Sequence, residues 1–510
     1  MALAEISFHP QLSALGSSRT GGLASAESTG GQEAWPVAIL GVPFANVTLS
    51  GAIARIDAMM DTRTPHYVVT ANVDFLIQAR RDVELRRILI EADLVLCDGT
   101  PLVWASRWLG NALPERAAGS DLVPQLIELA ARKGRRVFLL GGAADVVDEA
   151  AARLQAQHPS LILAGHYSPP FRSLLDMDHE EITRRIRQAK PDLLLVSFGC
   201  PKQEKWIAMH YRALGVPVVI GVGGTIDFLA GRLKRAPMWM RVSGCEWLYR
   251  LRQEPRRLIR RYVDDFFRFF PAIAAQWWRV PPTAAAAELN EHKASFTTQH
   301  WLRIWVGHYF TASSLDRAAA FWRDALHYRR HCLLDLSSVR AIDSTGAALL
   351  VQWRKQLRAV GRELVLLYPS PAVRRALREL KLDDLFLVAE SLAQAQQQVA
   401  EAMGYGPPTV FNEGTAGSLA WQGEITAANA EGAWLVTALH LITRGKTGPI
   451  PIDLSRLRFV DSTGAGLMVR VAQLARQFDT DVRFTGAQPD VCNVLRLTQT
   501  DRLLAPLAVA

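Results

Sequence analysis

A carboxylate able to act as a base follows a short apolar run in the first half of this 510-residue chain. Residues 94–97 are Leu-Val-Leu-Cys, and Asp98-Gly99-Thr100-Pro101 comes next. A carboxylate at the end of a strand can take the proton from an acceptor hydroxyl during group transfer. Asp-Gly is also a common turn, and Thr-Pro suits the start of a helix. The residues alone therefore leave both interpretations of Asp98 open.

Two more motifs combine hydroxyl, amide, carboxylate and guanidinium groups. The motif Thr70-Ala71-Asn72-Val73-Asp74 offers groups that hold a sugar or a nucleotide, and its alternative role is to cap a helix. Further along, Arg116 lies a few residues before Ser120 and Asp121. We expect Ser120 or Asp121 to cap the following helix, and a capped N-terminus beside an arginine is also a phosphate site.

Two glycine-containing segments are further candidate site motifs. Gly199-Cys200-Pro201 is followed by a polar cluster that includes Gln203 and Glu204, and this layout is typical of a site at a strand end. Its alternative is a solvated first turn in which Glu204 complements the helix dipole. The segment 221–225 contains Gly223 and Gly224 and favours phosphate, although it matches neither a Walker loop nor GxGxxG.

These motifs need strands to hold them, and short apolar runs alternate with amphipathic stretches such as 121–133 and 180–189. That alternation predicts an α/β fold, with a Rossmann-like parallel sheet and helices on both faces. Ligands bind beyond the carboxyl ends of such strands, where the motifs lie. The expected strands are Val37–Gly41, His66–Ala71, Leu94–Cys97, Arg136–Leu140, Leu161–Ala164, Leu193–Phe198 and Val218–Val222.

Positive charge is concentrated in one segment. Residues 232–279 hold twelve Arg and Lys against four acids, a net of +8 out of +9 for the chain. Aromatic residues are interleaved with these charges, which suits an anionic membrane interface or a nucleic acid. The alternative is a packed terminal helix with a solvated basic face. Of the two anionic partners we favour the membrane and expect no nucleic acid.

Other features narrow the class of protein. The composition, 49% hydrophobic and 21% charged, is that of a globular chain. Five scattered cysteines favour reduced thiols, and we expect neither a signal peptide nor a transmembrane helix. The Asp176-Met177-Asp178 triplet is interpreted as a chance DxD, and the histidines lack metal-ligand spacing. We expect no metal and no cofactor.

The second half of the chain contains an internal repeat. Residues 335–347 read DLSSVRAIDSTGA, and residues 453–465, which lie 118 positions later, read DLSRLRFVDSTGA. Each copy predicts a strand, an Asp-Ser-Thr-Gly turn, an amphipathic helix and a further strand. Ser344 and Ser462 are expected to cap these helices, and both are candidate phosphorylation sites because a helix N-terminus favours a phosphate.

Taken together and in order, the motifs of the first half resemble the WecG/TagA/CpsF family of bacterial glycosyltransferases. The resemblance runs from about residue 36 to residue 270 and rests on TANVD, DGTP, ERAAGSDL, FGCPKQEKW, GVGGTIDFLAG and the arginine-rich segment 235–262. It implies an inverting transfer of an N-acetylhexosamine or hexose from a UDP-sugar to an undecaprenyl-diphosphate-linked acceptor in surface polysaccharide synthesis. It also implies no required metal.

The resemblance assigns roles residue by residue. It implies that Asp98 is the base, that Thr70 and Asn72 contact sugar and acceptor, and that Gln203 belongs to the pocket. Arg116 is implied on the phosphate side. The basic appendage is expected to complete the site at a membrane, so the protein is expected in the cytoplasm, peripheral on the cytoplasmic face of the inner membrane. Candidate clamps for the diphosphate are Arg235, Arg241 and Arg250.

The repeated half resembles STAS domains, the fold of anti-sigma factor antagonists, in which DSTG carries a phosphorylatable serine. We expect the tandem to bind a regulatory protein or kinase. The alternative function is a signalling scaffold that binds a nucleotide without catalysis. The expected divisions are a flexible tail (1–34), the α/β domain (35–231), the basic appendage (232–280), a linker (281–295) and two STAS-like domains (296–405 and 406–510).

Overall fold

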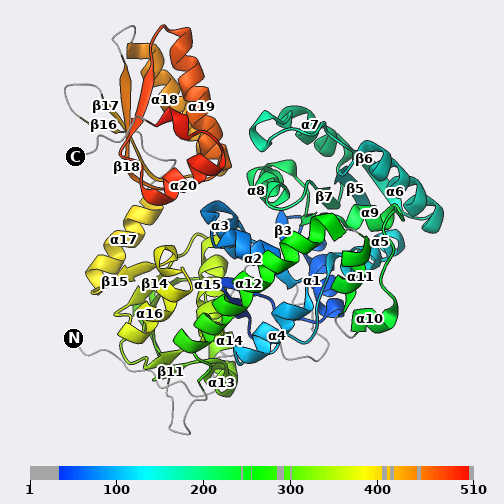
Figure 1. The fold of residues 1–510 in the computed structure, drawn as a ribbon. Coiled ribbons are helices and arrows are strands. Elements are labelled where there is room, and N and C mark those ends of the chain that lie inside the picture. Colours follow the sequence, from blue (N-terminus) through cyan, green and yellow to red (C-terminus); the bar gives the residue numbers. More distant parts are fainter. Residues whose placement is uncertain are drawn as a thin grey trace, which may run out of the picture. The chain divides into compact units, whose positions relative to one another are not determined.

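The computed structural model describes most of the chain, in two compact units (Figure 1). One unit comprises Met1–Thr48, Pro101–Glu115 and Phe270–Gly404, and the other comprises Leu49–Thr100, Arg116–Phe269 and Tyr405–Ala510. The expected tail, apart from residue 34, and residues 284–291 of the expected linker lie outside the described residues. The described residues are 34–242, 245–253, 255–283, 292–298, 301–404, 411–413, 418–444 and 449–504.

A six-stranded sheet in the second unit confirms the predicted α/β fold. Its order is β4-β3-β8-β7-β5-β6, and every neighbouring pair is parallel. The four strands β3, β4, β7 and β8 are almost wholly buried, which explains their near-continuous apolar sequences. The strands are β3 (His66–Ala71), β4 (Leu94–Cys97), β5 (Arg136–Gly141), β6 (Ile162–Tyr167), β7 (Leu193–Ser197) and β8 (Val218–Gly221).

Helices cover both faces of this sheet, as the alternation predicts (Figure 1). One face packs against α1 (Leu49–Thr62), α5 (Gly119–Lys133) and α6 (Ala144–Gln157), and the other against α7 (His179–Ala189) and α8 (Lys202–Leu214), with α3 (Val83–Glu91) packed on α8. Because the faces are covered, polar groups of the sheet can reach a ligand only beyond the ends of the strands. The remaining helices of the first half are α2 (Val73–Ala79), α4 (Thr100–Trp108), α9 (Thr225–Leu229), α10 (Met238–Val242), α11 (Glu246–Gln253) and α12 (Pro255–Arg279).

The prediction that the first expected strand, 37–41, belongs to this sheet is wrong. This segment forms an antiparallel ribbon of β1 (Val37–Ile39) and β2 (Val42–Phe44) and takes no part in the six-stranded sheet. Leu40 and Gly41 make the two-residue turn with φ of 50° and 85°. A two-residue hairpin turn with both φ values positive matches the twist of antiparallel strands. A Cβ at position 41 would also lie 2.2 Å from the carbonyl oxygen of Leu380.

Each repeat folds as a small α/β domain with the same strand pairing. The sheet orders are β15-β14-β12-β10-β9 and β16-β17-β18-β19, and in each sheet only the first two strands along the chain are antiparallel. In the first repeat the strands are β9 (Lys293–Thr298), which begins inside the expected linker, β10 (Trp301–Trp305), β12 (His331–Asp335), β14 (Leu364–Leu367) and β15 (Leu387–Ala389), with β11 (Tyr309–Phe310) and β13 (Ala341–Ile342) paired separately.

The helices of the two repeats surround these sheets. The first repeat has α13 (Ala312–Arg317), α14 (Ala319–His327), α15 (Ser344–Ala359), α16 (Pro371–Glu379) and α17 (Leu392–Gly404). The second repeat has β16 (Phe411–Glu413), β17 (Ser418–Ile425), β18 (Ile450–Val460) and β19 (Val482–Thr485), with α18 (Ala430–Arg444), α19 (Ser462–Gln477) and α20 (Pro489–Leu497). The strands and helices that the repeat predicts after each DSTG turn are confirmed.

Aspartates, not serines, cap the two DSTG helices. Asp343 Oδ1 accepts from the amides of Thr345 and Gly346, and its Oδ2 accepts from the amide of Ala312 at 2.9 Å. Asp461 makes the matching bonds to Gly464 and Ala427. The expectation that Ser344 and Ser462 are the caps is wrong, because each serine is already the first helical residue.

The cap yields a stability prediction. Replacing Asp343 with Ala should lower the opening free energy of α15 by about 1–3 kcal/mol, because three buried amides lose their acceptor. Native-state hydrogen exchange measures the opening of α15 itself. Asp343→Asn keeps an acceptor oxygen and serves as the control. Equal protection of α15 in wild type and Asp343→Ala would contradict the role of the cap.

Candidate functional site

A cavity of about 350 Å³ lies at the carboxyl ends of four neighbouring strands, β4, β3, β8 and β7. Pockets of small-molecule ligands commonly span about 300–1,000 Å³. Residues from α11 and α12 also line the cavity, so the basic segment completes its wall. Predicted site residues that line it are Thr70, Asn72, Asp98, Gln203, Gly223, Gly224 and Arg250.

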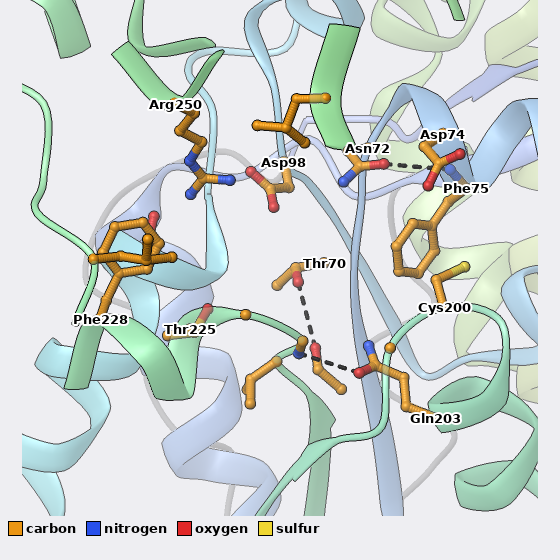
Figure 2. A pocket seen from close by; sticks show the side chains of 18 of the residues that line it. Thr70, Asn72, Asp74, Phe75, Asp98, Cys200, Gln203, Thr225, Phe228 and Arg250 are labelled. Carbon is orange, nitrogen blue, oxygen red and sulfur yellow. Dashed lines mark hydrogen bonds between the residues drawn. The ribbon is translucent and has the colours of Figure 1, made fainter. Parts of the chain in front are cut away.

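Asp98 stands at the mouth of β4 and is half-buried. Its amide donates to the carbonyl oxygen of Ala71 at 2.8 Å, which continues the pairing of β3 with β4. Figure 2 shows its carboxylate facing the guanidinium of Arg250. Burial raises the pKa of Asp98, and the positive charges of Arg250 and Arg116 lower it in part, so the net pKa lies above the ordinary value. A carboxylate with a raised pKa is a stronger base.

Hydroxyl groups converge opposite Asp98. Thr70 Oγ1 donates to the carbonyl oxygen of Gly221 at 3.5 Å. A Cβ at Gly119 would lie 3.2 Å from Thr225 Oγ1 and 3.4 Å from Thr70 Oγ1, so a larger residue there would crowd these groups. Ser120 Oγ is buried and has no hydrogen-bond partner among the described residues, although it lines the cavity. This hydroxyl is free for a ligand.

Asn72 caps a helix and also lines the cavity. Its side-chain oxygen accepts from the amide of Phe75 at 3.3 Å and caps α2. The same residue lines the cavity, as do Asp74 and Phe75 (Figure 2). Its side-chain NH2 group remains available to a bound molecule, because the cap uses only the oxygen.

Gln203 is fixed in one orientation. Its Oε1 accepts from the amide of Gly223 at 3.1 Å, and its Nε2 donates to Glu204 Oε1 at 2.6 Å. A Cβ at Gly221 would lie 2.8 Å from Gln203 Nε2, so this position needs a glycine. Glu204 is fully buried, and burial raises its pKa to about 7 although the Gln203 amide favours the charged form. The expected alternative of a solvated first turn is therefore wrong.

The arginines of the site share two carboxylates. Arg116 pairs with Glu246 at 2.6 Å and with Asp121 at 3.3 Å. Arg235 contacts the same two acids, and Arg241 reaches Asp121 at 3.5 Å. Burial alone would raise the pKa of Glu246, but the hydrogen bond and charge of Arg116, with the neighbouring arginines, hold it below the ordinary value. These three arginines are not among the described residues that line the cavity.

Arg250 connects this cluster to the cavity. Its Nε lies 3.8 Å from Glu246 Oε1, and its guanidinium stacks over the ring of Phe228 at 5.1 Å. Phe228 lines the cavity from α9. The carboxylate of Glu246 and the aromatic ring together aim Arg250 into the site.

The expected cap of α5 is a further correction. The N-cap is Ala118, which makes no side-chain cap bond, so neither Ser120 nor Asp121 caps the helix. Asp121 instead holds Arg116, Arg235 and Arg241. The requirement for a counter-ion among several arginines outweighs the modest gain from a cap.

Sequence reasoning named no site role for several lining residues. Arg261 lies 4.0 Å from Asp74, and both line the cavity. Asp265 lies near them, and burial together with the charge of Asp74 raises its pKa to about 7. Thr225 and Phe228 were also missed; they lie three residues apart in α9, which places both on one side of a helical turn. The matched motifs contain these residues, but a motif does not tell which side chains point inward.

Apolar side chains are exposed beside the site. On α12, Ile259, Val263, Phe266 and Phe267 follow the i, i+4, i+7, i+8 spacing of a single helix face and are 51–70% exposed. Met238 and Trp239 on α10 are each 67% exposed. Within the part of the chain that the structure describes, no helix has the length and hydropathy needed to span a bilayer.

Both DSTG serines are inaccessible. Ser344 and Ser462 are each fully buried, at 0% exposure. Ser344 Oγ accepts from Gln276 Nε2 at 2.8 Å, and Ser462 Oγ donates to Glu84 Oε2 at 2.7 Å. Neither serine lines the cavity, so phosphorylation of either would require its surroundings to open first.

Comparison with known proteins places the first half in a described family. Residues 37–282 match the profile described as Glycosyl transferase WecG/TagA/CpsF family. Relatives from Staphylococcus aureus strains MW2 and NCTC 8325 / PS 47 are both named N-acetylglucosaminyldiphosphoundecaprenol N-acetyl-beta-D-mannosaminyltransferase. Each is 33% identical over 235 residues, which is 46% of this chain and 91% of the relative.

The second half matches two domain profiles. Residues 287–395 match the STAS domain, and residues 410–505 match the profile described as Mlab, STAS domain. A solved structure titled "Structure of the Anti-Sigma Factor Antagonist SpoIIAA in its Unphosphorylated Form" is 18% identical. It covers 23% of this chain and 99% of its own, with a TM-score of 0.19, which is too low to support a structural argument.

Glu204 gives a pH-dependent stability prediction. With a folded pKa of about 7 against an ordinary 4.5, the folded chain holds a proton that the unfolded chain has lost, so this group destabilises the fold as pH rises from 4.5 to 7. Glu204→Gln is neutral throughout. We expect its free energy of unfolding to exceed that of wild type by on the order of 1–3 kcal/mol at pH 8, and by little at pH 5.

Thermal unfolding of both proteins at pH 5 and pH 8 measures this difference. Asp265 also titrates near 7 but is present in both proteins, so its contribution cancels. An equal shift of the midpoint at the two pH values would contradict the burial of a titrating Glu204. The variant Glu180→Gln, on the exposed surface of α7, is the control and should shift neither midpoint.

Proposed function

This chain belongs to the WecG/TagA/CpsF family of glycosyltransferases and carries two STAS domains, and we propose that it transfers a sugar from a UDP-sugar to an undecaprenyl-diphosphate-linked acceptor. The observation that carries the proposal is the Asp98 carboxylate in a cavity at the strand ends, facing Arg250 (Figure 2). The sugar is an N-acetylhexosamine or a hexose. The named relatives, which transfer N-acetylmannosamine, favour the first of these.

In the proposed reaction Asp98 takes the proton of the acceptor hydroxyl. The freed oxygen attacks the anomeric carbon of the donor, and the bond from that carbon to the diphosphate breaks. The electron pair leaves with UDP, and the configuration at the anomeric carbon inverts because attack and departure occur on opposite faces. The raised pKa of Asp98 suits it to hold the proton during this step.

Surplus positive charge beside Asp98 supports a diphosphate site. Four guanidiniums, those of Arg116, Arg235, Arg241 and Arg250, share the two carboxylates of Asp121 and Glu246. The cluster therefore keeps a formal charge of +2 for a ligand. Arg250 is the first contact because it already lines the cavity, and Arg116, Arg235 and Arg241 would exchange a carboxylate for a phosphate.

The hydroxyl and amide groups of the cavity fit the uncharged parts of the substrates. The free Ser120 hydroxyl, Thr70 and the NH2 group of Asn72 offer hydrogen bonds of the kind that sugars take. Gly223 and Glu204 hold the side chain of Gln203, so its amide group meets a substrate in a fixed orientation. Gly223 and Gly224 leave the backbone open to a close approach by the nucleotide.

The exposed apolar stripe of α12 supports a peripheral place on an anionic membrane. Isoprenoid acceptors stay in the bilayer, so the enzyme must come to them. Phe266 and Phe267 would enter the interface while neighbouring arginines contact lipid phosphates. The inner membrane's cytoplasmic face is the proposed site, because UDP-sugars are cytoplasmic.

The STAS tandem is proposed as the regulatory part, with a kinase or regulatory protein as its partner. The competing function, a nucleotide-binding scaffold without catalysis, is disfavoured because Asp98, Thr70, Asn72, Gln203 and Arg250 are all gathered in one cavity. A nucleic-acid partner is disfavoured because the excess positive charge is confined to one appendage, residues 232–279.

The first functional prediction concerns the base. Asp98→Asn should lower turnover by about 100-fold or more, because the amide cannot take the acceptor proton. UDP release across several UDP-sugars, with a polyprenyl-diphosphate-sugar acceptor, measures this. UDP binding should survive in the variant. Wild-type chain that binds UDP but releases none with any donor would favour the scaffold, and near-normal turnover of Asp98→Asn would exclude Asp98 as the base.

The second concerns the membrane. Replacing Trp239 and Phe267 with Ala should weaken binding to anionic vesicles about tenfold or more, since each exposed ring loses apolar burial at the interface. Vesicle co-sedimentation at low and high salt measures the affinity. Phe171→Ala is the matched control because Phe171 is 96% exposed but lies outside the basic segment. An equal loss of vesicle binding in the control would contradict the assignment of the exposed stripe as the membrane contact.

A further inference from the structure

The second STAS domain contacts the transferase through its DSTG serine. Ser462 Oγ donates to Glu84 Oε2 at 2.7 Å, and the amide of Ser462 donates to Glu84 Oε1. Glu84 lies in the first turn of α3 and is 1% exposed, so this is a buried carboxylate bound by a serine from a different domain. A buried carboxylate without partners costs several kcal/mol. The contact therefore supplies two of the hydrogen bonds that Glu84 accepts in its buried position.

A lysine of the transferase completes the cluster. Lys205 Nζ lies 2.8 Å from Glu84 and 2.7 Å from Asp82, which also caps α3. Burial alone would lower the pKa of Lys205, but the two carboxylates raise it above the ordinary value. On the STAS side, burial and the charge of Glu84 raise the pKa of Asp461 to about 7. Two acids thus pair with one cation and a third acid, Asp461, lies near Glu84, so a further negative charge would be strongly unfavourable.

Other contacts of α3 extend this interface. Arg87 pairs with Glu424 at 2.7 Å, and its guanidinium lies over the ring of Phe459 at 5.0 Å. Val83 packs against the apolar core of the STAS domain, and its amide donates to Asn493 Oδ1 at 3.4 Å. One face of α3 therefore supplies apolar, cationic and anionic contacts to the same domain.

The equivalent serine of the first STAS domain has a neutral partner. Gln276 Nε2 donates to Ser344 Oγ and to the carbonyl oxygen of Ala38, and its Oε1 accepts from the amide of Leu40. No carboxylate takes part in these bonds. Of the two DSTG turns, the second is the one whose docking depends on charge.

The docked cluster adjoins the proposed active site through α8. Gln203, Glu204 and Lys205 are consecutive and all buried in the first turn of that helix. Gln203 lines the cavity, Glu204 orients its amide, and Lys205 holds Glu84. A movement of Lys205 would be transmitted through one helical turn to Gln203.

We propose that the α3–α8 face of the transferase is a charge-sensitive docking surface for the DSTG end of the second STAS domain, and that docking fixes the turn of α8 that carries Gln203. The link to catalysis rests on the proposed function, whereas the docking itself does not. A negative charge on Ser462 would release the domain and loosen the pocket.

Hydrogen exchange and transfer assays on the full-length chain test this. Ser462→Asp puts a second carboxylate against Glu84, although an acid at the first helical position is compatible with α19 itself. We expect exchange in α3 and in the first turns of α8 and α19 to rise at least about 100-fold, and transfer to fall about tenfold. Gln473→Glu adds the same charge on the exposed side of α19 and should change neither.

A double variant separates charge from misfolding. Glu84→Ser combined with Ser462→Asp exchanges the hydroxyl and the carboxylate, leaves the number of acids in the cluster unchanged, and should restore both protection and transfer. Unchanged exchange in Ser462→Asp, or no recovery in the double variant, would overturn the docking. Faster exchange in α3 and α19 with an unaltered first turn of α8 would overturn the link to Gln203. If wild type itself transfers no sugar, the proposed function fails, and the exchange data alone decide the docking and its link to α8.

Discussion

The site depends on an unequal balance between arginines and carboxylates at one edge of the sheet. Asp121 and Glu246 are too few to neutralise the four arginines around them, and Asp98 is the next acid, facing Arg250 across the cavity. Burial raises the pKa of Asp98, the charges of Arg250 and Arg116 partly offset that rise, and the two paired acids keep the arginines in place.

The sheet and the motif positions were predictable because burial constrains sequence strongly. β3 and β4 match the expected strands, and the motifs at their ends reach one cavity because parallel strands share a carboxyl edge. The ribbon of β1 and β2 was not predictable from the same signal, since Val37–Ile39 is apolar in either setting. Only the backbone at Leu40-Gly41 distinguishes a hairpin from a strand.

The pairing of the arginines could not be predicted from the sequence. Composition shows an excess of charge but not its pairing, so Arg250, which lines the cavity, could not be told from Arg235 and Arg241, which do not. Asp121 is a good cap by residue type, yet three arginines compete for its carboxylate and win. Long-range ion pairs link residues more than a hundred positions apart, and local propensity carries no information about them.

The two STAS domains show how one motif acquires two uses. The Asp cap, its bonds to the following turn and the buried serine are the same in both, because the turn requires them. What differs is the group that each serine meets: the amide of Gln276 or the carboxylate of Glu84. Apolar residues could fill the space around Glu84, Lys205 and Asp82 at no loss of stability. A buried ionic cluster makes the contact depend on charge instead, and its Lys205 lies two residues after Gln203, which lines the cavity.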